Sequence, residues 1–389
     1  GKNIAINSTE TGYMILPFEK TTVKKLAVSL AQWDGSPTGV SLSEAIFYES
    51  DNLESEVRGL FANDTYTELS ASAITDKAAT IQKIESLRAQ ANDSEGYYVD
   101  KDVLLDELQL AEDLLENKAD ALGRVKNGIE SRSTGADSAK YKQAGSDLQP
   151  LGVVAYATDY AERNKFDETK VTIYAHIPEN ETVYVVPTQY YAEANAWQGA
   201  GIPLQNGRNI IEIPKIGTQT SERGGSLYLK YSGSKPEEVS LQIRQGAIAI
   251  PMLELADWYN ISETERKERI GVYVDELSAH TSALNPNNIS LRIANSTEIS
   301  MPNVLLSVAA QPVLNAVKPT NASRDDSINT LYNNVLAWED MMHIVNTTQG
   351  IDNTYSNSDM QSRQNIRYMR MFAKAFMYAA GSHIGIGYG

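Results

Sequence analysis

The pattern of apolar residues changes several times along the chain, and these changes constrain the fold more than any single motif. Residues 1–50 and 148–260 carry short runs in which apolar and polar residues alternate, as in β-strands. Residues 51–147 carry apolar residues at helical spacing, and residues 261–389 mix both patterns. At 389 residues the chain is also long enough for more than one domain. The sequence therefore predicts an α+β multidomain protein.

Residues 148–260 predict a β-sandwich, because short strand-like runs follow one another with turn residues between them. Gln205-Asn-Gly and Arg223-Gly-Gly are two of these turns. The expected strands are Leu151–Thr158, Lys170–Ile177, Thr182–Pro187, Arg208–Ile213, Ser226–Tyr231 and Val239–Ile243.

Residues 51–147 predict a small antiparallel helical bundle with a spacer or scaffold role. The expected helices cover Leu53–Phe61, Thr75–Gln90 and Lys101–Ile129. The acidic residues of the last helix are expected on a solvated face, and these are Asp106, Glu107, Glu112, Asp113, Glu116 and Asp120. They lack the tight loop with glycine that a calcium site needs.

Residues 261–389 predict a mixed α/β region. Ser262 and Glu265 form a capping box for a helix to about His280, and Ser323 caps a second helix. We expect strands over 289–294 and 304–308 and a turn at Asn285-Pro-Asn-Asn. His343, on the second helix, is interpreted as a packed or surface histidine. The final helix is expected over 367–380, with a stripe formed by Met369, Phe372, Phe376 and Ala380.

The composition excludes several classes of function. A formal net charge of −16 argues against nucleic acid and against an anionic membrane surface. Without cysteine the chain can form neither disulfides nor a thiolate zinc site, and we expect a secreted or cell-surface bacterial protein. No apolar run is long enough to insert into a membrane. We expect a monomer.

The last stretch resembles a known family. Phe372–Met377, followed after Tyr378 by Ala-Ala-Gly-Ser-His-Ile-Gly-Ile-Gly, is similar to the segment that opens the active-site half of the enhancin-like, mucin-degrading zinc metallopeptidases. Ser296–Ser300, Val304–Val308 and the helix from Ser327 to Glu339 are also similar, so the resemblance covers roughly residues 150–389. It implies that residues 261–389 are the N-terminal part of a metallopeptidase catalytic domain.

The sequence departs from this family because it has no His-Glu-x-x-His motif. The resemblance implies zinc as the cofactor of the intact protein, yet this chain supplies no metal ligand set and no catalytic residue. Its histidines are His176, His280, His343 and His383, and none has a second histidine four residues away. We therefore expect the chain to stop before the zinc-binding helix.

A second resemblance concerns residues 1–50, where Ser43-Glu-x-x-Phe-Tyr48 is similar to the closing strand of discoidin-like carbohydrate-binding modules. The region is then the β-rich remnant of a carbohydrate-binding sandwich. A short hairpin packed on the next domain is the alternative.

The candidate substrate-binding residues are His383, Gly381, Gly385 and Trp197. The resemblance implies that His383 lines the substrate cleft and that the glycines let the backbone approach the substrate. The alternative is a glycine turn with His383 bonded to backbone. Trp197 could stack on a sugar face or cap the end of the sandwich.

The resemblance implies the N-terminal portion of a secreted zinc endopeptidase, whose partners are O-glycosylated, mucin-like proteins and whose zinc-activated water attacks the peptide bond. The alternative functions are a non-catalytic glycan-binding or adhesin fragment and a structural stalk.

Overall fold

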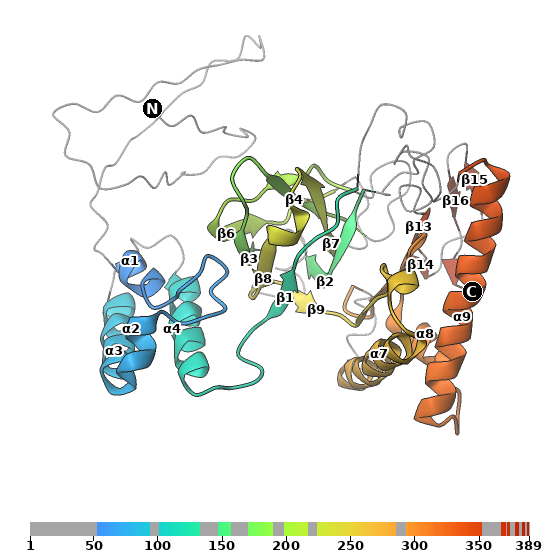
Figure 1. Cartoon of the computed structure of the whole chain (residues 1–389). Helices are drawn as coiled ribbons and strands as arrows, with labels where there is room; N and C mark the ends of the chain where they lie inside the picture. The colour runs from blue at the N-terminus through green and yellow to red at the C-terminus, as the bar shows by residue number, and fades with distance from the viewer. Residues whose placement is uncertain are drawn as a thin grey trace, which may run out of the picture.

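The computed structural model describes residues 53–93, 101–132, 147–156, 170–189, 198–216, 224–284 and 293–351, together with the backbone of five short strands between 367 and 388. The described chain is a mixed α/β structure built in layers (Figure 1). Helices from the N-terminal part cover one side of a pair of β-sheets, and a third sheet with its own helices covers the other side. The predicted β-rich remnant at residues 1–50 lies outside the described residues.

The helical layer contains α1 Leu53–Arg58, α2 Ala71–Thr75, α3 Lys77–Asp93 and α4 Lys101–Leu115. Ser70 begins α2 as its N-cap and accepts a hydrogen bond from the backbone N–H of Ala73, at 3.4 Å. Apolar residues one helical turn apart, such as Ile84 with Leu87 and Leu104 with Leu108, meet in one buried core.

The helix expected to continue to Ile129 is wrong beyond Leu115. The backbone leaves the helix at Asn117, which has a φ of 55°, and then forms strand β1 Arg124–Asn127. This strand pairs antiparallel with β8 Ser240–Ile243, more than a hundred residues later in the chain. A pairing at that distance in sequence overrides the local helical spacing of Leu122 and Val125, which pattern reading alone cannot detect.

Two antiparallel sheets pack face to face in the middle of the molecule. One has the strand order β1-β8-β3-β6 and the other has the order β5-β4-β7-β2-β9. Their strands are β2 Gln149–Tyr156, β3 Lys170–His176, β4 Thr182–Pro187, β5 Ile202–Pro203, β6 Gly207–Glu212, β7 Gly224–Ser232, β8 Ser240–Ile243 and β9 Ile248–Ala249, with the 3-10 helix η1 Pro236–Glu238. Apolar residues from both sheets meet between them, as Val171 and Ile173 do with Val183 and Leu229.

The C-terminal layer begins with β10 Met252–Glu254 and η2 Trp258–Asn260. Its helices are α7 Glu263–Ala283, α8 Ala310–Val317 and α9 Arg324–Thr348, and its strands are β11 Thr297–Ser300, β12 Val304–Val308 and β13 Arg367–Arg370. The sheet has the order β10-β11-β12-β13. The predicted turn at 285–288 and the first part of the strand expected over 289–294 lie outside the described residues, and Ile293 and Ala294 are not in a strand.

The capping predictions hold in part. Ser323 and Asp326 form the complete capping box of α9. Ser262 caps α7 by accepting a hydrogen bond from the backbone N–H of Glu265, at 3.2 Å. The carboxylate of Glu265 instead accepts from Arg269, one turn along the helix, at 2.6 Å. The predicted second half of the box is therefore replaced by an ion pair within the helix.

The final helix expected over 367–380 is wrong. The backbone forms β13, β14 Phe372–Ala373 and β15 Tyr378–Ala380, followed by β16 His383–Gly385 and β17 Gly387–Tyr388. Strand β13 pairs parallel with β12, from Val304 opposite Arg367 to Ser307 opposite Arg370. For β13, as for β1, a partner strand far away in the sequence overrides the helical spacing, whereas β15 pairs with the neighbouring strand β16.

No helix in the described part of the chain combines the length and the apolar character needed to cross a membrane.

Candidate functional site

The predicted substrate-binding residues divide into two described and two undescribed positions. His383 and Gly385 both lie on β16, which pairs antiparallel with β15, with Ala380 opposite His383 and Tyr378 opposite Gly385. His383 is thus part of a β-hairpin. Gly381 and Trp197 lie outside the described residues. Whether these four residues line a substrate cleft stays a prediction.

The sheet that leads into this hairpin carries a buried polar row. Glu298 on β11 lies opposite Ser307 on β12, and Ser307 lies beside Arg370 on β13. The side chains of Glu298 and Ser307 are fully buried. Sequence reasoning missed this row. The signal that could have found it was an acidic residue inside an otherwise buried strand, Thr297–Ser300.

Alternation along the strands tells which face this row occupies. Ile299 and Leu306 pack against the core of α7 and α9, so Glu298 and Ser307 are on the opposite face. That face also carries Leu305, which packs against Val186 and Tyr228 of the middle sheets. The side chains of Glu298 and Ser307 are therefore enclosed between two sheets.

A second buried carboxylate fixes the turn between β11 and β12. Glu339 on α9 accepts a hydrogen bond from the side-chain amide of Asn303 at 2.8 Å and another from the hydroxyl of Tyr259 at 3.0 Å. The backbone N–H of Asn303 donates to the other oxygen of the same carboxylate, at 3.3 Å. These contacts join the turn, α9 and η2, and they hold β12 in position beside β13.

The helical layer meets the middle sheets through a third polar set. Tyr174 on β3 donates a hydrogen bond to Glu107 on α4 at 2.9 Å, and Arg208 on β6 lies 3.6 Å from the same carboxylate oxygen. Arg208 also forms an ion pair with Glu54 on α1, at 3.1 Å. Glu107 is only 1% exposed, so its predicted place on a solvated face is wrong. The sequence shows an acidic residue at this position but not the sheet that covers it.

Burial controls the ionisation of this set. Burial raises the pKa of Glu107 to about 7, although Arg208 and the hydrogen bond from Tyr174 both act to lower it. Burial and the neighbouring Glu107 raise the pKa of the Tyr174 hydroxyl above its ordinary range. The ring of Tyr66 stacks on Tyr174 with 4.3 Å between the ring centroids, and the side chains of Tyr66, Tyr174 and Glu107 are all buried.

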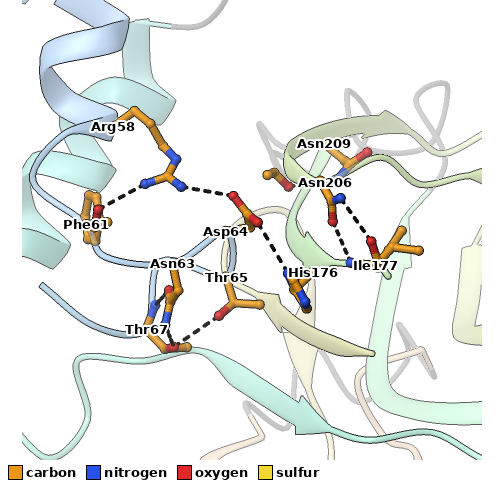
Figure 2. Close-up of polar contacts among 11 residues, drawn as sticks. Arg58, Phe61, Asn63, Asp64, Thr65, Thr67, His176, Ile177, Asn206 and Asn209 are labelled. Carbon is orange, nitrogen blue, oxygen red and sulfur yellow. Dashed lines mark hydrogen bonds and ion pairs between the residues drawn. The ribbon is translucent and has the colours of Figure 1, made fainter. Parts of the chain in front are cut away.

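The rim of this junction is a partly exposed series of polar contacts, shown in Figure 2. Arg58 on α1 donates to Asp64 at 2.9 Å, and Asp64 lies 3.3 Å from Nδ1 of His176 at the end of β3. The loop between α1 and α2 thus reaches the sheet, while Asn206 bonds both backbone groups of Ile177 next to it.

The described histidine side chains do not form a metal site. His176 belongs to the rim described above, and Nε2 of His280 lies 2.7 Å from the carbonyl of Ala294. His343 is exposed on α9, as predicted for a surface histidine. Within the described ranges, no group of three His, Asp or Glu residues could hold a metal ion. These residues do not fit the zinc that the sequence resemblance implies.

Comparison with known proteins gives matches in structure. No family model matches the sequence, and no curated protein matches it. The structure of the CBM32-1, CBM32-2 and M60 catalytic domains of Clostridium perfringens ZmpB has 22% sequence identity and a TM-score of 0.52, over 88% of this chain and 32% of that one. This chain therefore spans about a third of the length of that structure.

Two further solved structures match less well. A metallopeptidase from Bacteroides thetaiotaomicron has 12% identity and a TM-score of 0.49, over 89% of this chain and 48% of that one. The M60 catalytic domain of Clostridium perfringens ZmpC, solved in complex with the sialyl T antigen, has 19% identity and a TM-score of 0.45. The match covers 68% of this chain and 48% of that one. The comparison of folds rests on ZmpB, and it supports the enhancin-like resemblance at the level of the fold.

Proposed function

From the fold that this chain shares with part of the clostridial ZmpB structure, we propose that it is the N-terminal portion of a secreted zinc endopeptidase acting on O-glycosylated, mucin-like proteins. The observation that carries this proposal is the structural match over 88% of the chain. The sequence resemblance in the segment from Phe372 to Gly387 supports the same family.

In this proposal the described residues supply the framework and not the metal site. The sheet β10-β11-β12-β13 is held between the middle sheets and α7 with α9, and β13 leads into the hairpin that carries His383 and Gly385. A rigid framework of this kind positions a substrate-binding segment. Zinc would supply a water activated for attack on the peptide bond, and its ligands would lie outside the described residues.

The domain organisation belongs to the proposal as well. We propose a carbohydrate-binding remnant over 1–50, a helical spacer over 51–147, a sandwich over 148–260 and the first part of the catalytic domain over 261–389. Strand β1 is part of one sandwich sheet, so the spacer as a structural unit ends before Arg124. We propose that the protein acts outside the cell as a monomer.

A glycopeptide cleavage assay tests the function. The natural protein that contains this sequence is incubated with a mucin-type peptide carrying one O-glycan and with the same peptide unglycosylated, each with and without a chelator. We expect mass spectrometry to show cleavage of the glycosylated peptide alone, abolished by the chelator and restored by zinc.

The competing function is a glycan-binding or adhesin fragment, and the same samples distinguish the two. Retention of intact glycopeptide, with no cleavage in the presence of zinc, would support the glycan-binding function and refute the peptidase. Neither binding nor cleavage would indicate a structural stalk.

A further inference from the structure

The junction between the helical layer and the sheet β1-β8-β3-β6 holds one negative charge more than its contacts neutralise. Arg208 is within ion-pair distance of two carboxylates, Glu54 at 3.1 Å and Glu107 at 3.6 Å. One guanidinium balances one carboxylate, so these three groups are neutral only when one carboxyl carries a proton.

Two other carboxylates near this junction, Asp106 and Asp64, have partners of their own. Asp106, beside Glu107 on α4, forms an ion pair with Arg244, which extends from the end of β8. Asp64 contacts Arg58 of α1 and His176 of β3 at the rim. With these two carboxylates paired, the excess negative charge falls on Glu54 and Glu107, which share Arg208.

Geometry decides which of the two carboxyls takes the proton. The side chain of Glu54 is 35% exposed and lies nearer to Arg208, at 3.1 Å against 3.6 Å for Glu107. Glu107 is 1% exposed and packs among the rings of Tyr66 and Tyr174. Its Oε1 accepts the hydrogen bond from Tyr174, which leaves the other oxygen to carry the proton.

We propose that Glu107 is a proton-linked latch, which holds the helical layer on the sheet when protonated and loosens it when the proton leaves. Ionisation would place a second carboxylate beside Arg208 in a buried junction, where an uncompensated charge is strongly unfavourable. The contact that weakens is the one between α4 and strands β3 and β6. This inference does not depend on the proposed peptidase function.

The pH at which the latch acts follows from the direction of the pKa shift. Burial raises the pKa of Glu107 from 4.5 to about 7 in the folded protein. The folded state therefore binds the proton more tightly than the unfolded state. The added stability is fully present below about pH 4.5 and is lost as the pH rises through about 7.

Hydrogen exchange measured by mass spectrometry tests the proposal on the whole chain. Protection factors of peptides from 101–115 are compared between pH 5.5 and pH 8.5 after correction for intrinsic exchange rates, with peptides of α7 as the internal reference. We expect the α4 peptides to lose roughly tenfold or more in protection at the higher pH and the α7 peptides to change little. Equal protection of α4 at both values would overturn the proposal without the need for any variant.

Variants assign the effect to the carboxyl of Glu107. Glu107→Gln keeps the shape of the protonated acid and is expected to abolish the pH dependence of α4. The control Glu112→Gln removes the same charge from a half-buried position on the same helix, where Glu112 pairs with Arg88, and this variant is expected to keep the pH dependence of α4. His176→Asn removes the imidazole at the rim, and this variant is also expected to keep the pH dependence of α4. A pH dependence that survives in Glu107→Gln, or that disappears in His176→Asn, would contradict the assignment.

Discussion

The hydroxyl of Tyr174 donates a hydrogen bond to Oε1 of Glu107, with 2.9 Å between the oxygens, and so joins two residues that are 67 positions apart in the sequence. Both side chains are buried, and they belong to different layers, Tyr174 to β3 and Glu107 to α4. The helical layer is therefore attached to the sheet through a specific polar contact as well as through apolar packing.

Removing this hydroxyl should weaken the attachment. In Tyr174→Phe the ring still packs against Tyr66, but a buried carboxyl loses its donor, which costs about 1–3 kcal/mol. We expect a loss of this size in the free energy of unfolding, measured by urea denaturation at pH 6. The control is Tyr184→Phe on β4, a half-buried tyrosine of the other sheet. An equal loss in both variants would show that the Tyr174 hydroxyl has no special role.

The N-cap of α9 is the second test. Ser323 accepts a hydrogen bond from the backbone N–H of Asp326 at 3.1 Å, and Asp326 accepts one from the backbone N–H of Ser323 at 3.1 Å. Ser323→Ala should reduce the free energy of unfolding by about 1 kcal/mol. Ser282→Ala, near the end of α7 on an exposed face, serves as the control and should change it by a few tenths at most. If the cap does not contribute to stability, the two variants will have the same free energy of unfolding.

The buried carboxylate of Glu339 is the third test. Glu339→Ala removes the acceptor for Asn303 and Tyr259, and leaves the polar groups of the buried Asn303 without it. We expect a loss of about 2–4 kcal/mol in stability. Asp340→Ala removes the same charge from the next, exposed residue and should cost less than 1 kcal/mol. Thermal denaturation of both variants measures these losses. A small loss of stability in Glu339→Ala would mean that the turn does not depend on this contact.

Alanine substitutions at two glycines distinguish the cost of backbone strain from the cost of steric overlap. Gly246 and Gly207 both have positive φ, 75° and 81°. A Cβ at Gly246 would overlap the carbonyl oxygen of Lys170, whereas a Cβ at Gly207 would meet nothing within 4 Å. We expect Gly207→Ala to cost about 1–2 kcal/mol and Gly246→Ala clearly more, measured by urea denaturation. Similar losses would show that the turn at Gly246 relaxes easily.

The sequence predicted those elements whose signals are local. Ser262 and Ser323 each lie just before an apolar helical pattern, and both begin helices in the structure. The strands of the sandwich were predictable because apolar residues alternate between clear turn signals, as in Lys170–His176.

The errors arose where pairing over long distances determines the structure. Residues 122–129 and 367–380 have helical spacing, yet β1 pairs with β8 and β13 pairs with β12. Glu107 was expected in solvent because it lies among other acidic residues, but the sheet carrying Tyr174 covers it. The site could be predicted only through the resemblance, which indicated His383 and Gly385. The structure places both on one hairpin strand, and their function stays a prediction.

The stoichiometry of bound zinc tests the central claim most directly. Metal analysis is made on the 389-residue chain and on the natural protein that contains it, after dialysis against trace zinc. If residues 1–389 form the framework of a metallopeptidase without its metal ligands, the natural protein should retain about one zinc ion and the 389-residue chain far less. Tight zinc in the 389-residue chain, lost when His383 is replaced by Asn, would contradict the claim, and so would a natural protein without zinc.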